Sequence, residues 1–292
     1  MTELSAEVKA HFKDQVYSHR APPETIRRHL DEIVAYDAFV NAQLSKWGTF
    51  GCVGALAALG CFFAGAAMLP SPIGKGLWGL GGGVLIFAVV AGIKYSSWNT
   101  VDLDDDRLAF VKSVLEALRR DMGKDADMEV HFDFDDPTRD SKKTGSGKIG
   151  PWSVTYYENN WLLIEGRFLD KTSFRITLLE KIQERSRWKT NARGKTKHKF
   201  KTKVAKLFGV QLRPSTRKYG TPERLNETLK KAVKLPPGAS CRKLSGDEKK
   251  MGLEVQLKGD TDNKASLAVL FGMLLSCYQA LNLGRDVIKK AA

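Results

Sequence analysis

The stretch that decides the fold is GTFGCVGALAALGCFFAGAAML at residues 48–69, which is followed after six residues by GLWGLGGGVLIFAVVAGI at 76–93. The two runs are 22 and 18 residues long, and neither contains a charged side chain. A helix needs about 20 apolar residues to cross the hydrocarbon core of a bilayer. The connection PSPIGK is too short for a domain but long enough to reverse the chain. The sequence therefore predicts a membrane α-helical hairpin of two transmembrane helices over residues 48–94.

Aromatic and basic residues beside the two runs predict their orientation. Trp47 precedes the first run and Trp98 follows the second, as expected for rings that favour the headgroup region. The connection carries only Lys75 as a charged residue. The outer flanks are more basic, with Arg27, Arg28, Lys46, Lys94, Arg107 and Lys112. The positive-inside rule then puts both termini in the cytoplasm, so we expect a multi-pass protein of the cell or inner membrane.

Small residues recur at helical spacing in both runs. Ala57, Cys61 and Gly65 follow one another at intervals of four, as do Gly79 and Gly83. Such spacing lets helix backbones approach closely. These faces fit either packing of the two helices on each other or a homo-oligomer. Because neither run contains Asp, Glu, Lys, Arg or His, a proton path or ion-coupled transport is not expected.

The segments next to the hairpin predict helices on the cytoplasmic side. Residues 1–47 contain an amphipathic pattern over 2–20 and a second helix that begins at 22–24 and continues into the first run. Three aspartates at 104–106 favour the start of a juxtamembrane helix within 95–125, because acidic side chains stabilise helix N-termini. The apolar stripes of these helices fit an antiparallel stalk or contacts between copies of the chain.

Residues 126–292 predict a cytoplasmic α+β domain with a mainly antiparallel sheet. Alternation of apolar and polar residues is typical of half-buried strands. The strand candidates are residues 130–134, 152–158, 161–168, 173–179 and 253–257. We expect turns at Asn159–Asn160 and Asp170–Lys171, and a flexible polar loop at 144–150.

Two helices complete this predicted domain. One begins at Thr221, and a long one begins near Lys264. Its uncharged stretch 265–284 is long enough for a third membrane span, but its polar residues, among them Ser266 and Gln279, favour a helix buried against the sheet. We therefore expect two spans rather than three.

Charge is the most informative feature of the domain. The chain has a net charge of +14, and residues 95–292 hold 39 Lys and Arg against 26 Asp and Glu. Residues 185–222 contain thirteen basic residues and no acidic one. Within this segment basic residues alternate with uncharged ones, so an extended chain would have one cationic face. The predicted anion-binding residues are Arg187, Lys189, Arg193, Lys195, Lys197, Lys199, Lys201 and Lys203.

Like charges on one strand face repel one another, which indicates an anionic partner rather than selection for stability alone. A solvated basic loop or a protective lysine-rich edge strand are the simpler alternatives. Anionic lipid is the nearest candidate partner for a membrane-tethered domain. Nucleic acid is the second, although Trp188 and Phe200 are the main aromatic residues interleaved with the charge. The acidic surface of another protein would need the same face.

Catalytic motifs are not recognisable in the sequence. The stretch TGSGKIG at 144–150 lacks the leading glycine and the Ser or Thr after lysine of a phosphate-binding loop. His131, Asp133 and Asp135 alternate as a solvated strand face would, and the remaining histidines are scattered along the sequence. Glu158 is the only further candidate for acid or base chemistry. We expect no catalytic residues, no metal site and no cofactor.

Two functional hypotheses follow. The first is a membrane-anchored, non-enzymatic binding or scaffold protein whose basic domain engages an anionic partner. The second is a membrane effector whose cytoplasmic domain senses a phosphorylated ligand and whose hairpin then rearranges and perturbs the bilayer.

Overall fold

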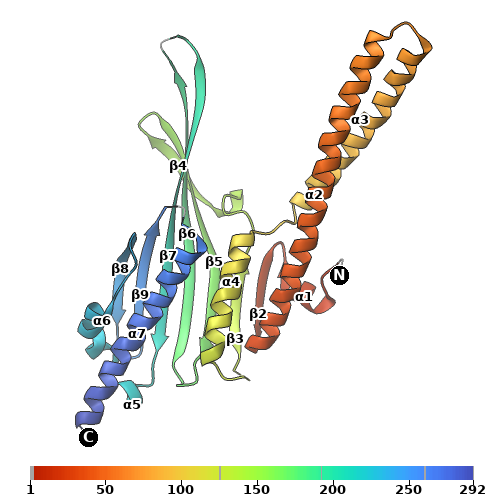
Figure 1. The fold of residues 1–292 in the computed structure, drawn as a ribbon. Helices are drawn as coiled ribbons and strands as arrows, with labels where there is room; N and C mark the ends of the chain where they lie inside the picture. Colours follow the sequence, from red (N-terminus) through yellow and green to blue (C-terminus); the bar gives the residue numbers. More distant parts are fainter. Residues whose placement is uncertain (1–2, 125, 192, 260, 292) are drawn as a thin grey trace. The chain divides into compact units, whose positions relative to one another are not determined.

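The computed structural model describes residues 3–124, 126–191, 193–259 and 261–291. The chain forms two compact units. One consists of Met1–Val8 and Asp31–Leu103, and the other of Lys9–Leu30 and Asp104–Ala292. The fold combines an antiparallel sheet with helices, and three helices in the described residues are long and apolar enough to cross a membrane. Figure 1 gives the labels of the elements.

The first unit is built on two long helices, α2 (Pro23–Ala67) and α3 (Pro72–Asn99), of which α2 begins in the other unit. They pack antiparallel at small residues. Gly48 lies against Tyr95, and Gly54 lies against Ala88. At Gly65 a Cβ atom would come within 2.7 Å of the Trp78 ring, so only glycine allows this approach.

The predicted small-residue faces are only partly used in this packing. Cys61 and Gly65 of α2 face α3, where Gly81 lies against Cys61. Gly79 and Gly83 have no other side chain within 4 Å of where a Cβ would lie, so they point away from α2. Within residues 48–93 most of the large apolar side chains are exposed, among them Leu56, Phe63 and Ile86. Only 17% of the most apolar window of each helix is buried.

The second unit contains a nine-stranded sheet in the described part of the chain, with every neighbouring pair antiparallel. The strands are β1 (Phe12–Lys13), β2 (Val16–Ala21), β3 (Met128–Asp133), β4 (Lys143–Ile149), β5 (Trp152–Arg167), β6 (Ser173–Thr190), β7 (Thr196–Arg213), β8 (Ala239–Gly246) and β9 (Met251–Lys258). The sheet order is β1-β2-β3-β5-β6-β7-β9-β8, and β4 pairs with β5 outside this path.

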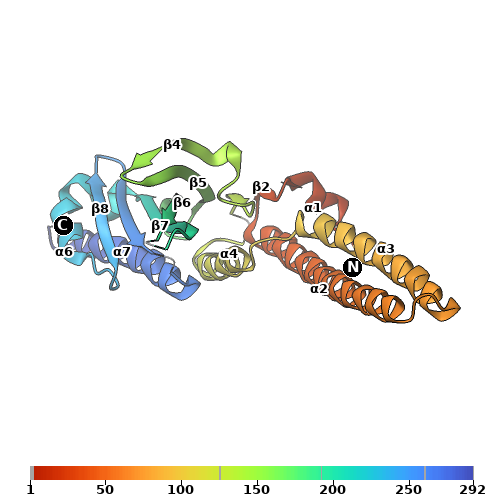
Figure 2. The same cartoon turned by 90° about the horizontal axis from the view of Figure 1, so that it is seen from above.

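Helices cover one face of the sheet. Figure 2 shows α4 (Asp105–Leu118) and α7 (Asn263–Ala291) on the same side of the strands. The core lies between these helices and the sheet. There the paired residues Leu178, Phe208 and Val255 of β6, β7 and β9 are fully buried. Shorter elements close the unit: α1 (Ala6–His11), which begins in the first unit, α5 (Thr216–Tyr219), α6 (Asn226–Ala232) and the 3-10 turns Arg119–Asp121, Asp140–Lys142 and Pro222–Leu225.

α7 contains the uncharged stretch 265–284, for which the sequence allows either a third membrane span or a helix buried against the sheet. Half of its most apolar window is buried, against 17% for α2 and α3. Val269, Met273 and Cys277 have no exposed surface. The helix therefore packs on the sheet, in agreement with the preferred prediction.

Three local predictions differ from the structure. Residues 2–20 do not form one helix, because only Ala6–His11 is helical and Val16–Ala21 pairs with β3. Asn159–Asn160 is not a turn but part of the continuous strand β5, with a bulge beside it that tolerates the two asparagines. Residues 144–150 are not a loop, because Lys143–Ile149 forms β4 against β5. β2 forms because it pairs with β3, which is distant in sequence, whereas β4 forms a hairpin with the strand that directly follows it. In both cases sheet pairing overrides the local sequence preference.

A buried ion pair ties α4 to the sheet. The Arg107 guanidinium lies 2.6 Å from the Glu180 carboxylate on β6 and donates to the carbonyl oxygens of Asp133 and Asp135 at 3.0 Å. The side chains of Arg107 and Glu180 are only 6% and 10% exposed. The Trp161 ring lies 5.1 Å from the guanidinium carbon.

We predict that R107A destabilises the fold by about 3–5 kcal/mol, because the Glu180 charge would remain buried without its partner. The measurement is urea unfolding of the full chain in detergent. The double variant R107M/E180M should recover most of the loss, and R120A, which breaks an exposed pair at 3.7 Å, should cost less than about 1 kcal/mol. Equal losses for R107A and R120A would show that the pair is not important for the fold.

Candidate functional site

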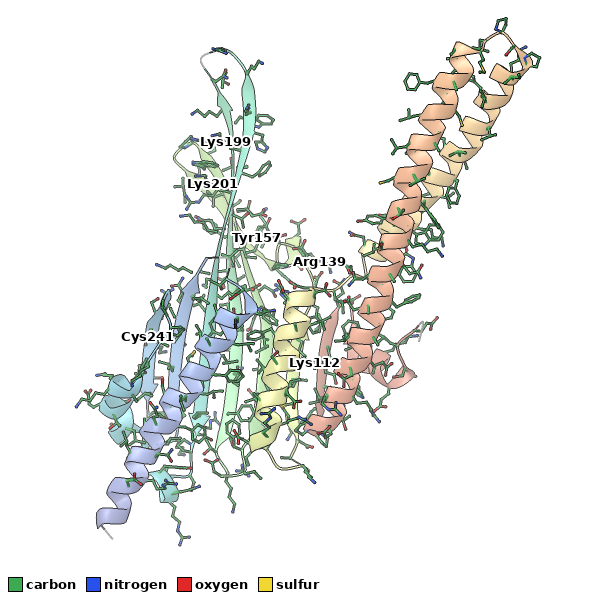
Figure 3. The ribbon with its side chains drawn as sticks, viewed as in Figure 1. Lys112, Arg139, Tyr157, Lys199, Lys201 and Cys241 are labelled. Carbon is green, nitrogen blue, oxygen red and sulfur yellow. The ribbon has the colours of Figure 1, made fainter. Side chains whose placement is uncertain are left out.

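The candidate site is the end of the β6–β7 hairpin, here called the basic finger and defined as residues 185–203. β9 pairs with β7 only from Ala205 onward, and β5 pairs with β6 only as far as Ser186. The hairpin therefore extends beyond its neighbours, as Figure 3 shows at Lys199 and Lys201. In Figure 1 it is the teal hairpin that projects farther from the sheet than the neighbouring yellow-green hairpin of β4 and β5.

The strand register gathers basic residues on one face of the finger. Side chains of directly paired residues in an antiparallel ladder lie on the same face. The three successive pairs are Arg185 with Lys201, Arg187 with Lys199, and Lys189 with Lys197. Lys203 lies on the same face opposite Gln183. Among the described residues, none of these cations lies within 4 Å of a carboxylate.

The predicted residues occupy two settings. Six of the eight lie on this cationic face: Arg187, Lys189, Lys197, Lys199, Lys201 and Lys203. Arg193 and Lys195 instead lie in the turn, where their backbone N–H groups donate to the Asn191 side chain at 3.1 and 2.9 Å. Gly194 takes the positive φ of +75° that the turn requires. Alternation alone did not reveal that the strand begins only at Thr196.

The face contains two further residues, Arg185 and Trp152, that the sequence prediction does not include. Arg185 continues the two-residue spacing of Arg187 and Lys189, so the sequence alone could have indicated that it lies on this face. Trp152 lies next to Arg187, and its ring is 4.4 Å from the Arg187 guanidinium carbon and 5.5 Å from the Lys201 ammonium. Cation–π contacts of this kind hold both cations in place. Nothing in the sequence links residue 152 to residue 187.

The opposite face of the finger is aromatic. The Trp188 ring stacks on His198 with centroids 4.4 Å apart, and Phe200 meets His198 edge-on at 4.0 Å. Trp188 and Phe200 remain 70% and 71% exposed. Large aromatic side chains left in water are unfavourable for a monomer and are typical of contact surfaces. The finger is therefore amphipathic, with cations on one face and exposed rings on the other.

His131, Asp133 and Asp135 do not form the solvated strand face that the sequence predicts, because β3 ends at Asp133 and both aspartates are buried. Lys142 lies 2.8 Å from Asp133. Arg139 lies 2.9 Å from Asp135, so both carboxylates belong to a structural ion-pair network. Glu158 pairs with Lys181 at 2.6 Å. In the described residues no hydrogen bond or ion pair joins His131, Asp133 and Glu158.

Three histidines that are separate in sequence come together in the structure. His11 and His19 stack with ring centroids 3.7 Å apart, and His29 lies 5.6 Å from His19. The Tyr17 hydroxyl is 2.9 Å from Nδ1 of His29. Stacked rings cannot direct their nitrogens at one ion, and no cluster suited to a metal occurs within the described ranges.

No protein-family model, curated protein or solved structure matches the chain. Its function is therefore inferred from the chemistry of the basic finger and of the long apolar helices.

We predict that K199E stabilises the finger by about 0.2–1 kcal/mol, because it replaces a like-charge pair with Arg187 by an opposite-charge pair. Thermal unfolding at low salt is the measurement, and added salt should reduce the gain. K258E on β9 is the matched control, because the residue directly paired with Lys258 is the uncharged Ala205, so this change creates no directly opposed charge pair. A loss of stability with K199E would contradict the assigned register.

Proposed function

We propose that this protein is a non-enzymatic, membrane-anchored binding protein whose basic finger docks on anionic lipid headgroups. The main support for this proposal is the amphipathic character of the finger. Unpaired cations concentrate on one face, and exposed aromatic rings occupy the other. If the hairpin enters the headgroup region tip first, both its cationic face and its aromatic face contact the headgroups.

The membrane anchor in this proposal is the α2–α3 pair, acting as a two-span hairpin. Its exposed leucine, valine and phenylalanine side chains would be costly in water and are suited to hydrocarbon. The basic residues at its outer flanks support a topology with both termini, and the sheet unit, in the cytoplasm. The outward small-residue stripe of α3, which includes Gly79 and Gly83, offers a surface for self-association.

Lipid is favoured over the other anionic partners for two reasons. A membrane anchor keeps the leaflet at high local concentration, and each basic residue near an anionic surface contributes about 1 kcal/mol. Exposed tryptophan also favours the membrane interface. Nucleic-acid grooves, in contrast, place stacking rings beside the cations that track the backbone. Here the exposed rings of Trp188 and Phe200 lie on the face opposite the lysines. The Trp152 ring on the cationic face is already in contact with Arg187 and Lys201.

We predict docking that depends on both charge and salt. The full chain, carrying a fluorophore at T190C in a background free of the native cysteines, is placed in nanodiscs of neutral or anionic lipid. Brominated lipid should quench the fluorophore in anionic discs, and quenching should fall as salt rises. The variant K197Q/K199Q/K201Q removes about 3 kcal/mol of attraction, so the docking equilibrium should weaken roughly 100-fold.

The control for this experiment is K230Q/K231Q/K234Q, which removes the same charge around α6 and should leave quenching unchanged. Equal quenching in neutral and anionic discs, or equal effects of the two triple variants, would contradict docking by the finger. Salt-sensitive capture of a short single-stranded oligonucleotide that W188A/F200A abolishes would assign the finger to nucleic acid instead.

We further predict the orientation of the anchor. In sealed cells a membrane-impermeant thiol reagent should label S71C, between the two spans, from outside. Native Cys241, which is exposed on β8, should react only after permeabilisation. Labelling of Cys241 in intact cells would place the sheet unit on the wrong side for this proposal.

A further inference from the structure

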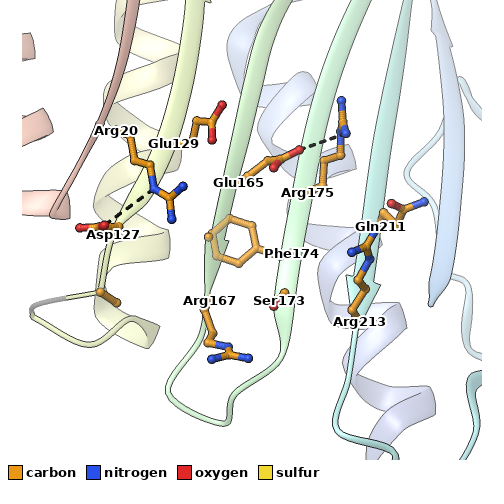
Figure 4. A pocket seen from close by; sticks show the side chains of 12 residues that line it. Arg20, Asp127, Glu129, Glu165, Arg167, Ser173, Phe174, Arg175, Gln211 and Arg213 are labelled. Atoms are coloured by element: carbon orange, nitrogen blue, oxygen red, sulfur yellow. Dashed lines mark ion pairs between the residues drawn. The ribbon is translucent and has the colours of Figure 1, made fainter. Parts of the chain in front are cut away.

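A second charged feature lies at the end of the sheet away from the basic finger. A hollow of about 530 Å³ opens there and is shown in Figure 4. Guanidinium groups from four strands line it: Arg20 of β2, Arg167 of β5, Arg175 of β6 and Arg213 of β7. Its volume falls in the range of small-molecule sites. Since β6 runs from Ser173 at the hollow to Lys189 in the finger, the two features are about 50 Å apart along the strand.

The register explains how these arginines gather. One row across the sheet runs Arg20, Glu129, Glu165, Arg175 and Gln211. The next row on the same face runs Arg167, Ser173 and Arg213, with Ser173 paired to both arginines. The central serine thus lies between two guanidinium groups.

Charge is unevenly balanced within the hollow. Arg175 lies 3.1 Å from Glu165, and Arg20 lies 3.7 Å from Asp127. Arg167 and Arg213 have no carboxylate within 4 Å among the described residues, although Arg213 acts on Asp247 from farther away. The excess positive charge therefore lies at the Arg167–Ser173–Arg213 end.

The opposite end of the hollow concentrates negative charge. Glu129 and Glu165 are directly paired across β3 and β5, and like charges in that arrangement repel. A ligand with hydroxyl or amino donors would relieve this repulsion. The hollow therefore has an anion-accepting end and a donor-accepting end.

The rim of the hollow is held in place before any ligand binds. Asp170, in the turn between Arg167 and Ser173, accepts hydrogen bonds from the Thr172 backbone at 2.8 Å and the Tyr219 hydroxyl at 2.7 Å. Burial opposes ionisation, but these hydrogen bonds leave the pKa of Asp170 below its ordinary value. At Gly166 a Cβ atom would lie only 2.8 Å from the Phe174 ring, so the absence of a side chain lets the ring pack against the strand. The hollow is thus preorganised, which reduces the entropic cost of binding.

We infer that this hollow binds a small phosphate ester, with its phosphate held by Arg167, Ser173 and Arg213 and its hydroxyl or amino groups facing Glu129 and Glu165. Two arginines on strands either side of Ser173 start about 10 Å apart, and both side chains can reach one phosphate over the serine. Arginine binds phosphate through paired N–H donors, which lysine does not. This inference uses no residue of the basic finger and goes beyond the proposed function.

The test uses the full chain in neutral nanodiscs at low salt, titrated calorimetrically with ribose 5-phosphate and with ribose. We expect saturable binding of ribose 5-phosphate and none of ribose. R167A/R213A should weaken binding at least tenfold, and R167K/R213K should weaken it less, because charge is kept while the paired donors are lost. R242A, an exposed arginine outside the hollow, and K197Q/K199Q/K201Q should each leave affinity within twofold.

A soluble ester and a lipid headgroup share this chemistry, and vesicles with and without phosphatidylinositol 4-phosphate separate them. If a headgroup is the ligand, R167A/R213A reduces capture of the phosphoinositide vesicles and ribose 5-phosphate competes with them. If a soluble ester is the ligand, the variant leaves capture unchanged. Because the finger can also capture anionic vesicles, the inference is overturned if ribose 5-phosphate does not bind and R167A/R213A leaves capture of phosphoinositide vesicles unchanged, or if R167A/R213A binds ribose 5-phosphate as tightly as the native chain does. Because both arginines are exposed, each variant should unfold at the native temperature, which a thermal melt checks.

Discussion

The unbroken pairing of β6 with β7 is the constraint on which the sheet unit depends. It runs from Ser173 opposite Arg213 to Thr190 opposite Thr196, and each pair directs two side chains to the same face. In the middle of the ladder this places Leu178 and Phe208 together in the core. Farther along it sets cation against cation in the finger, and at its other end it sets Ser173 opposite Arg213. The register of β5 with β6 adds Arg167 on the other side of Ser173. The β6–β7 register thus contributes to the core, the finger and the hollow.

Much of the fold was predictable from local patterns. Uncharged runs of 22 and 18 residues identify the two long apolar helices, because hydrophobic length is a property of contiguous sequence. The absence of acidic residues over 185–222 likewise marks the basic segment. Alternation predicts the shared face of Lys197, Lys199, Lys201 and Lys203, but it fails at Arg193 and Lys195, because a turn ends the period of two. Arg187 and Lys189 join that face only through the pairing of β6 with β7.

The remaining features depend on contacts between distant residues, which a single sequence does not reveal. Val16–Ala21 becomes a strand only because β3 is available to pair with it. The stacking of His11 on His19 and the contact of Trp152 with Arg187 require the assembled unit. Asp133 alternates like a solvated residue, yet Lys142 pairs with it in a buried position. Arg167 and Arg213 are 46 residues apart in the chain, so the hollow has no local signature.

The central claim is that the finger contacts anionic lipid, and amide hydrogen exchange in the full chain tests it most directly. Exchange is compared for residues 185–203 in neutral and anionic nanodiscs at low salt. We predict slower exchange in the finger in anionic discs only, with β9 unchanged and the effect lost at high salt. Identical exchange of the finger in both kinds of disc would contradict this claim.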